Sequence, residues 1–159
     1  MAAKATPATR LAEAAGALVA LRSYAHDPRS PSYALEAAEA LGLEPECVFK
    51  TLVCRLADGE HVVAIVPSDA RLDLKRLAAA AGAKQAAMAD PRDAERITGY
   101  VAGGISPLGQ KKPLRTFLDD AAAGHETVHV SAGRRGLELE IEPERLLQLT
   151  GGKLAVIAV

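Results

Sequence analysis

Two β-rich runs joined by a tight turn constrain the fold of this chain more than any other feature. The runs are VFKTLVCRL (48–56) and HVVAIVP (61–67), and the segment between them, ADGE, has Asp58 and Gly59 at its centre. Asp-Gly between two strand-like runs is a strong hairpin signal, because both residues tolerate the backbone angles of a tight turn. The sequence therefore predicts an antiparallel pair of strands near the middle of the chain.

Helical and strand-like segments are mixed around this hairpin. Helices are predicted where strong helix formers lie between capping signals, as between Ser32 and Gly42. Because the later strands follow one another with short connections, we expect an α+β fold in a single domain, 1–159, with a mixed, barrel-like β-sheet flanked by helices. The predicted helices cover 9–20, 32–42, 72–82, 90–99 and 143–151, and the further strands cover 21–27, 114–120, 127–131, 137–142 and 153–159.

Composition and charge narrow the possible functions. A net charge of −1 over 159 residues argues against a protein that coats nucleic acid, so no DNA partner is expected. No apolar run approaches the length of a membrane span, and Glu13 makes the Ala-rich start an amphipathic helix rather than an export signal. Cys47 and Cys54 have neither metal-ligand nor disulfide-framework spacing. We therefore expect a cytoplasmic protein with no membrane partner, no metal and no cofactor.

Lys50 is out of place in the first strand of the hairpin. Alternate residues of a strand share a face, so Lys50 shares one with Val48, Leu52 and Cys54. An ammonium group on an apolar face is costly unless it is paired or reaches an opening. Two interpretations stay open: Lys50 extends from the strand end to water, or it lies at the mouth of a pocket and faces a carbonyl or a phosphate.

The segment GYVAGGISPLGQKKPL places two glycines and a proline in one rigid turn. Gly103 and Gly104 allow a ligand to approach the backbone closely, and Pro107 fixes the far side of the turn. The backbone N–H groups of this loop can then form a small anion or oxyanion nest. A purely structural turn is the alternative, but it leaves the adjacent pair Lys111-Lys112 unexplained.

The remaining candidates are few. Ser131, at the start of SAGRRG, lies at a strand end from which it could enter a pocket, although for this segment taken alone an exposed hairpin is the better explanation. The sequence has neither a G-x-S-x-G elbow nor an H-E-x-x-H metal pair, and its four histidines are scattered among strand ends and turns. The sequence thus offers cationic and backbone donors without an evident nucleophile.

The segments VFKTL, GYVAGGISPLGQKK and VSAGRRGLELEI, in this order, resemble the bacterial YbaK/EbsC family. The members of that family are free-standing relatives of the editing domain inserted in prolyl-tRNA synthetase. The resemblance covers nearly the whole chain, from YAHD to the final helix. It implies a barrel-like mixed sheet and hydrolysis of a mischarged aminoacyl-tRNA, typically Cys-tRNA(Pro). The implied partners are the acceptor end of tRNA(Pro) and prolyl-tRNA synthetase.

The resemblance also assigns roles to single residues. Lys50 in FKTL matches the key lysine of the family, and the loop from Gly103 to Pro107 matches the segment expected to hold the terminal adenosine and the ester by backbone contacts. The turn AGRRG departs from a family turn that often has two glycines and a lysine. The implied catalytic residues are Lys50, Gly103, Gly104 and Ser131; the substrate-binding residues are Tyr24, Thr51, Ile105, Ser106 and Pro107; the tRNA-binding residues are Lys111, Lys112, Arg134 and Arg135.

Three functions are compatible with these residues. In the first, implied by the resemblance, the thiol of the cysteinyl group attacks its own ester, so that the protein supplies shape and electrostatics. In the second, water attacks the ester of alanine or another small amino acid. In the third, the chain is a non-catalytic RNA-binding or regulatory module. The presence of Lys50 on an apolar face argues against this third function.

Overall fold

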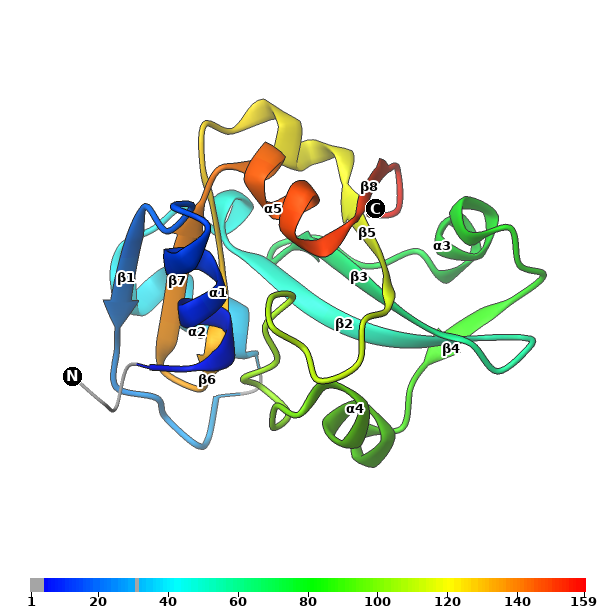
Figure 1. Cartoon of the computed structure of the whole chain (residues 1–159), viewed down its shortest axis with the longest axis horizontal. Coiled ribbons are helices and arrows are strands. Elements are labelled where there is room, and N and C mark those ends of the chain that lie inside the picture. The colour runs from blue at the N-terminus through cyan, green and yellow to red at the C-terminus, as the bar shows by residue number, and fades with distance from the viewer. Residues whose placement is uncertain (1–4, 31) are drawn as a thin grey trace.

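The computed structural model describes residues 5–30 and 32–159 and shows a mixed order of helices and strands (Figure 1). The α+β class predicted from the sequence is confirmed. The helices are α1 (Pro7–Ala14), α2 (Tyr33–Leu41), α3 (Leu74–Ala81), α4 (Pro91–Thr98) and α5 (Pro143–Thr150). The strands are β1 (Ala20–Ser23), β2 (Phe49–Leu56), β3 (His61–Pro67), β4 (Ala86–Met88), β5 (Arg115–Asp119), β6 (Val128–Arg134), β7 (Leu137–Ile141) and β8 (Lys153–Ala155).

The described strands form two open sheets, so the predicted barrel-like sheet is wrong. One sheet has the order β1-β7-β6 and is antiparallel throughout, and the other has the order β4-β2-β3-β5-β8. An isolated bridge between Val48 and His129 links them at one point. Beyond that bridge, side chains of β2, β6 and β7 line a pocket between the two sheets. The sheets therefore face each other through side chains there and are not joined by backbone hydrogen bonds.

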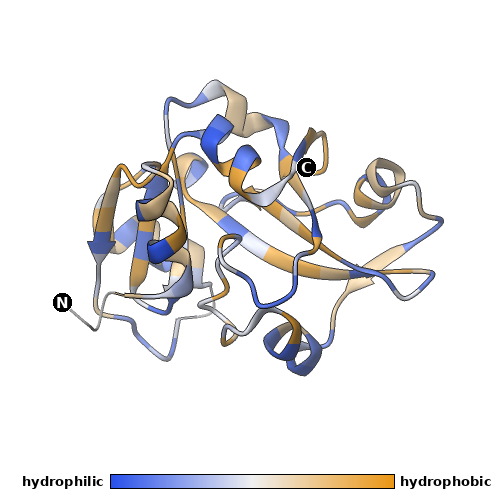
Figure 2. Cartoon of the chain, viewed as in Figure 1, coloured by the Kyte–Doolittle hydropathy of each residue, from blue (hydrophilic) through white to orange (hydrophobic). Residues whose placement is uncertain are grey.

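The predicted hairpin is confirmed and forms the centre of the larger sheet. Strands β2 and β3 pair antiparallel from Phe49 opposite Pro67 to Arg55 opposite His61. Strand β3 then pairs parallel with β5, which makes the sheet mixed. Both faces of the hairpin are buried, because one packs towards the smaller sheet and the other towards α3. Figure 2 shows the resulting apolar residues along the central strands.

The helix ends follow the local signals in the sequence. Ser32, Asp73 and Asp90 accept hydrogen bonds from backbone N–H groups at the starts of α2, α3 and α4. These helices end at left-handed glycines, as α2 does at Gly42 with φ 67°. In the described part of the chain, no helix is long and apolar enough to cross a membrane.

The structure departs from the predicted elements near both ends of the chain and in one strand that was not predicted. Helix α1 ends at Ala14 rather than at residue 20, because Gly16 has a φ of 67° and turns the chain towards β1. The last strand covers Lys153–Ala155 alone, since the chain bends away and Ala158 pairs with Leu72 instead. Strand β4, Ala86–Met88, was not predicted because an Ala-rich segment carries little strand propensity.

A candidate active site between the two sheets

A pocket of about 270 Å³ opens where β2, the start of α2, the smaller sheet and residues 103–107, here called the glycine loop, meet. Its wall combines apolar side chains with hydroxyl groups, one ammonium group and one carboxyl group. Segments far apart in sequence therefore contribute to one site. The lining residues are Ser32, Tyr33, Ala34, Phe49, Lys50, Thr51, Leu52, Gly103, Ile105, Ser131 and Glu138.

Lys50 lines this pocket from β2. It lies opposite Val66 in the hairpin, and its Nζ donates a hydrogen bond of 2.7 Å to the carbonyl oxygen of Ala70. Burial lowers the pKa of Lys50, and the nearby carboxylate of Asp69 acts in the opposite direction. The ammonium group is therefore half-buried at the pocket and bonded to a loop carbonyl, rather than extended into open water.

The glycine loop lines part of the pocket and also packs closely against neighbouring segments of the protein. Gly103 has a φ of 83°, and a Cβ added to it would lie 2.6 Å from the ring of Tyr33. The N–H of Gly104 donates to the carbonyl of Val101 at 2.9 Å, so that it is not a free member of a nest. Gly103 and Ile105 line the pocket, whereas Ser106 and Pro107 are buried outside its lining.

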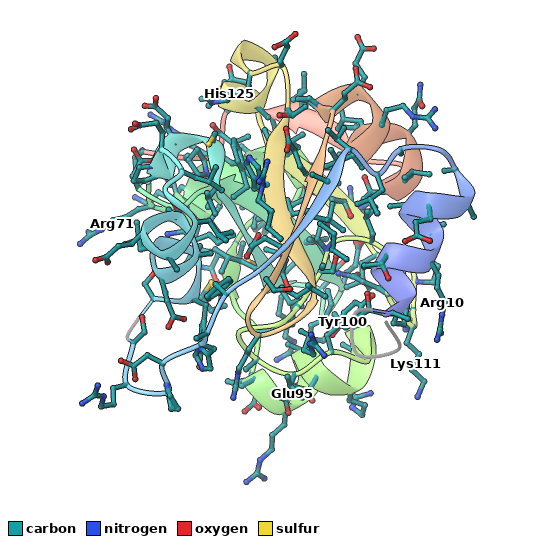
Figure 3. The ribbon with its side chains drawn as sticks, turned by 90° about the vertical axis from the view of Figure 1, so that its left-hand side faces the viewer. Arg10, Arg71, Glu95, Tyr100, Lys111 and His125 are labelled. Atoms are coloured by element: carbon teal, nitrogen blue, oxygen red, sulfur yellow. The ribbon has the colours of Figure 1, made fainter. Side chains whose placement is uncertain are left out.

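Buried hydrogen bonds hold the loop in this position. The hydroxyl of Tyr100 donates to the carbonyl of Leu108 at 2.7 Å, and Glu95 accepts from the N–H of Ala102 at 2.8 Å. Figure 3 shows Tyr100 within the molecule and Glu95 on α4 at its edge. The loop is thus fastened to α4 on one side and closed on itself on the other.

Gly104→Ala tests this close packing. The added Cβ would lie 2.9 Å from the backbone nitrogen of Arg135, and backbone cannot move aside as a flexible side chain can. We expect the free energy of unfolding to fall by about 1–3 kcal/mol, with reduced activity because the loop shifts. Chemical denaturation measures the first effect. Gly124→Ala is the matched control because its Cβ meets nothing within 4 Å, and equal stability of the two variants would contradict the packing argument.

The smaller sheet supplies Ser131 and Glu138, which lie opposite each other on β6 and β7. Ser131 Oγ accepts a hydrogen bond of 3.2 Å from the N–H of Gly133. The side chain of Glu138 was not predicted as part of the site. Glu138 is 5% exposed, burial raises its pKa to about 8, and its Oε2 has no hydrogen-bond partner among the described residues.

Two tyrosines differ from the prediction. Tyr24 does not line the pocket but packs against the small apolar cluster of Ala37, Ala38 and Val48. Burial, and to a smaller extent the charges of Glu138 and Glu36, raise the pKa of Tyr24 to about 12. Tyr33, which was missed, lines the pocket and lies against Gly103. Only the fold brings Tyr33 to the loop, since in sequence it is one more residue at the start of a helix.

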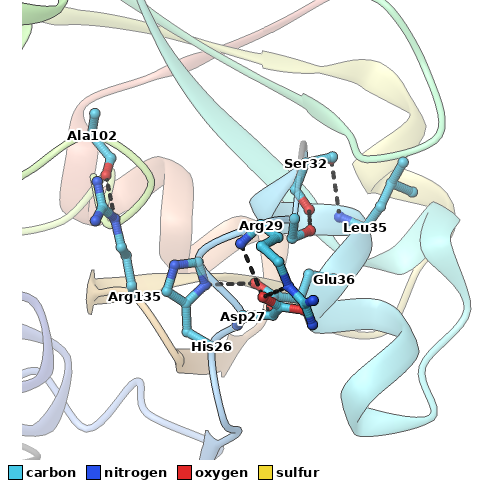
Figure 4. A network of polar contacts seen from close by, with 9 residues as sticks. His26, Asp27, Arg29, Ser32, Leu35, Glu36, Ala102 and Arg135 are labelled. Carbon is cyan, nitrogen blue, oxygen red and sulfur yellow. Dashed lines mark hydrogen bonds and ion pairs between the residues drawn. The ribbon is translucent and has the colours of Figure 1, made fainter.

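The predicted tRNA-binding cations do not form one site. Arg135 does not line the pocket, and its Nε donates to the carbonyl of Ala102 at 2.8 Å (Figure 4). Its guanidinium carbon lies 5.3 Å from the ring centroid of Tyr33, which does line the pocket. Arg134 is exposed at the end of β6. Lys111 and Lys112 line a separate hollow of about 420 Å³ together with His61, Arg96 and Ile97.

Neither cysteine lines the pocket. Burial raises the pKa of the Cys54 thiol to about 11, and burial also raises the pKa of the Cys47 thiol. Because the thiolate is the reactive form, both side chains are poor nucleophiles near neutral pH.

Comparisons with known proteins agree with one another. The aminoacyl-tRNA editing domain family matches residues 30–149. EbsC of Enterococcus faecalis, described as a candidate Cys-tRNA(Pro)/Cys-tRNA(Cys) deacylase, is 45% identical over 120 residues, which cover 76% of this chain and 73% of that protein. The multifunctional Ser/Thr-tRNA deacylase ProXp-y of Escherichia coli is 34% identical over 73 residues, 44% of each chain. The crystal structure of a candidate trans-editing enzyme for prolyl-tRNA synthetase has a TM-score of 0.80 at 28% identity, covering 98% of this chain and 99% of that one.

Proposed function

The chain belongs to the aminoacyl-tRNA editing domain family and is thus an aminoacyl-tRNA hydrolase, and we propose that it clears mischarged Cys-tRNA(Pro) in trans. The similarity to EbsC supports cysteine as the amino acid. The similarity to a structure described as a trans-editing enzyme supports prolyl-tRNA synthetase as the partner whose errors are corrected.

The observation that carries this proposal is a pocket with a cation but without a protein nucleophile. The described lining has hydroxyl groups but neither a cysteine nor a histidine, and its one carboxyl group, Glu138, makes no hydrogen bond to a hydroxyl group that it could activate as a general base. The thiol of a cysteinyl ester removes the need for such a pair, because it is part of the substrate and is already held at high effective concentration.

The chemical step then proceeds within the substrate. The sulfur of the thiol attacks the ester carbonyl carbon, and the bond from that carbon to the ribose oxygen breaks. The proton lost by the thiol is taken up by the leaving ribose oxygen, so the first step gives a cyclic thioester and a free ribose hydroxyl group. Water then adds to the thioester carbonyl, the bond from carbon to sulfur breaks, and cysteine is released. We assign to Lys50, which lines the pocket, the stabilisation of the negative charge that develops on the carbonyl oxygen.

The outer contacts follow from the cations around the pocket. Arg135 lies beside Tyr33, so the pair offers the terminal nucleotide a guanidinium group for its phosphate and an aromatic ring for its base. Lys111 and Lys112, in their separate hollow, are assigned to phosphates further along the acceptor end.

A second candidate keeps the fold and changes the amino acid. The similarity to a Ser/Thr-tRNA deacylase favours a hydroxylated side chain with water as the attacking group. Deacylation of tRNA(Pro) charged with cysteine, serine, threonine, alanine or proline separates the two. We expect rapid loss of cysteine alone, whereas rapid release of serine or threonine would support the second candidate.

The double variant Cys47→Ser, Cys54→Ser tests whether the thiol belongs to the substrate. We expect it to clear Cys-tRNA(Pro) at nearly the rate of the unchanged protein, because neither cysteine lines the pocket and burial raises both pKa values. Single-turnover deacylation measures this rate. A large loss of turnover, with the variant still folded by circular dichroism, would assign the nucleophile to the protein.

A further inference from the structure

Glu138 is a buried carboxyl group whose Oε2 has no hydrogen-bond partner among the residues that the structure describes. It lies on the central strand of the smaller sheet, between Arg22 on β1 and Ser131 on β6. Arg22 bonds the next carboxylate on that face, Glu140, at 3.2 Å rather than Glu138. A buried carboxyl group that lacks a partner costs stability, so its presence in a pocket wall calls for a ligand that supplies hydrogen-bond donors.

A second unsatisfied acceptor lines the same pocket from the opposite sheet. Thr51 Oγ1 on β2 is buried and has no hydrogen-bond partner among the residues that the structure describes. The pocket thus presents a carboxyl group and a hydroxyl oxygen on different walls, both able to accept. The one cation in the described lining, Lys50, donates from its Nζ to the carbonyl of Ala70 and makes no hydrogen bond to either acceptor.

Within an aminoacyl ester, one group matches this pair of acceptors. The ester and carbonyl oxygens only accept hydrogen bonds, and a thiol is a weak donor. The α-ammonium group carries a positive charge and three N–H donors, which form strong hydrogen bonds with a carboxylate. With the ammonium group bound there, Lys50 could contact the ester, and the apolar residues Phe49 and Ile105 could contact the side chain of the amino acid.

We propose that Glu138 binds the α-ammonium group of the aminoacyl ester and that Thr51 Oγ1 accepts a second hydrogen bond from it. This inference rests on the proposed deacylase function and adds a specificity: the site accepts esters with a free amino group and rejects those whose amino group is blocked. The contact fixes the Cα and hence the direction in which the ester faces Lys50.

The test crosses two changes, one in the protein and one in the substrate. Glu138→Gln keeps the shape of the side chain and removes the carboxylate that a bound ammonium group would hold ionised, and N-acetylation removes the charge of the amine. We expect the unchanged protein to prefer cysteinyl-tRNA(Pro) over N-acetylcysteinyl-tRNA(Pro) by about 10–100-fold, since hydrogen bonds to charged groups have this strength. Glu138→Gln should lose about the same factor on the free amine and change little on the acetylated substrate.

The matched control is Glu140→Gln, on the same strand and face but outside the pocket lining. It should retain both rates. A binding measurement complements the rates: an amide-linked cysteinyl-adenosine should bind Glu138→Gln more weakly than the unchanged protein, whereas its N-acetyl form should bind both alike.

Three outcomes would count against the inference or its premise. Equal losses on both substrates would show that Glu138 acts on the ester or on the fold and not on the amine. Unchanged rates in Glu138→Gln would also overturn the contact. Failure of the unchanged protein to deacylate any charged tRNA would instead overturn the proposed function, so that the two failures are distinct.

Discussion

Lys50→Ala is expected to lower the rate of Cys-tRNA(Pro) deacylation by about 10²–10³-fold, the usual cost of removing one group that stabilises a developing oxyanion. The reason is its position, because Lys50 is the ammonium group that lines the pocket. The fold should be little affected. The side chain is half-buried and makes one hydrogen bond, to Ala70, whose loss costs about 1 kcal/mol. Single-turnover deacylation and thermal denaturation measure the two effects.

Two further variants sharpen this test. Lys50→Met keeps the aliphatic stem on the apolar face and should lose as much activity as Lys50→Ala, since the charge is what matters. Lys75→Ala, at the start of α3 and outside the pocket lining, should retain full activity. A folded Lys50→Ala variant with normal activity would show that the ammonium group of Lys50 has no part in catalysis.

Glu138→Gln is expected to remove a loss of stability that the unchanged protein shows as pH rises. Burial raises the pKa of Glu138 in the folded protein from about 4.5 to about 8, so the folded state holds a proton that the unfolded state releases between these values. Over that interval the free energy of unfolding must fall as pH rises, by at most about 1.4 kcal/mol per pH unit for one proton. The penalty is absent below about pH 4.5 and fully developed above about pH 8.

Glutamine does not ionise, so the variant should escape this decline. Denaturation by urea at several pH values measures it, and we expect the variant to gain relative to the unchanged protein as pH rises. Glu140→Gln is a control in which the effect on stability has the opposite pH dependence. Hydrogen bonds from Thr127 and Arg22 lower the pKa of Glu140, so the ionised side chain stabilises the fold at neutral pH, and this stabilisation is lost as pH falls. Parallel pH profiles for Glu138→Gln and the unchanged protein would mean that Glu138 has a partner.

These two carboxyl groups, two residues apart on β7, show what burial implies for function. Glu140 bonds Arg22 and Thr127 and needs no ligand. Glu138 destabilises the fold at neutral pH while it lines the pocket, which is the pattern of a residue kept for binding rather than for stability.

The sequence by itself determined the features that depend on neighbouring residues. Asp58 and Gly59 specify the hairpin, and capping residues such as Ser32 specify helix starts, because turn and cap hydrogen bonds form within a few residues. Lys50 was found because the alternation of β2 makes a lysine on an apolar face conspicuous, whereas Thr51 was named only through the family resemblance. The family was identified from three short segments, and the comparisons confirm it. The extent of the domain, 1–159, stays a prediction.

Only the tertiary structure decided how distant segments meet. In LELEI, Glu138 and Glu140 have the same pattern and both suggest a solvent-facing side. The start of α2 and strand β2 meet Glu138 at the pocket, whereas Glu140 reaches Arg22 and Thr127. The same packing leaves the sheets open, places Tyr33 against Gly103 and keeps Tyr24 outside the pocket lining. Burial depends on segments far away in the chain, so local periodicity could not distinguish a carboxylate in water from one that needs a ligand.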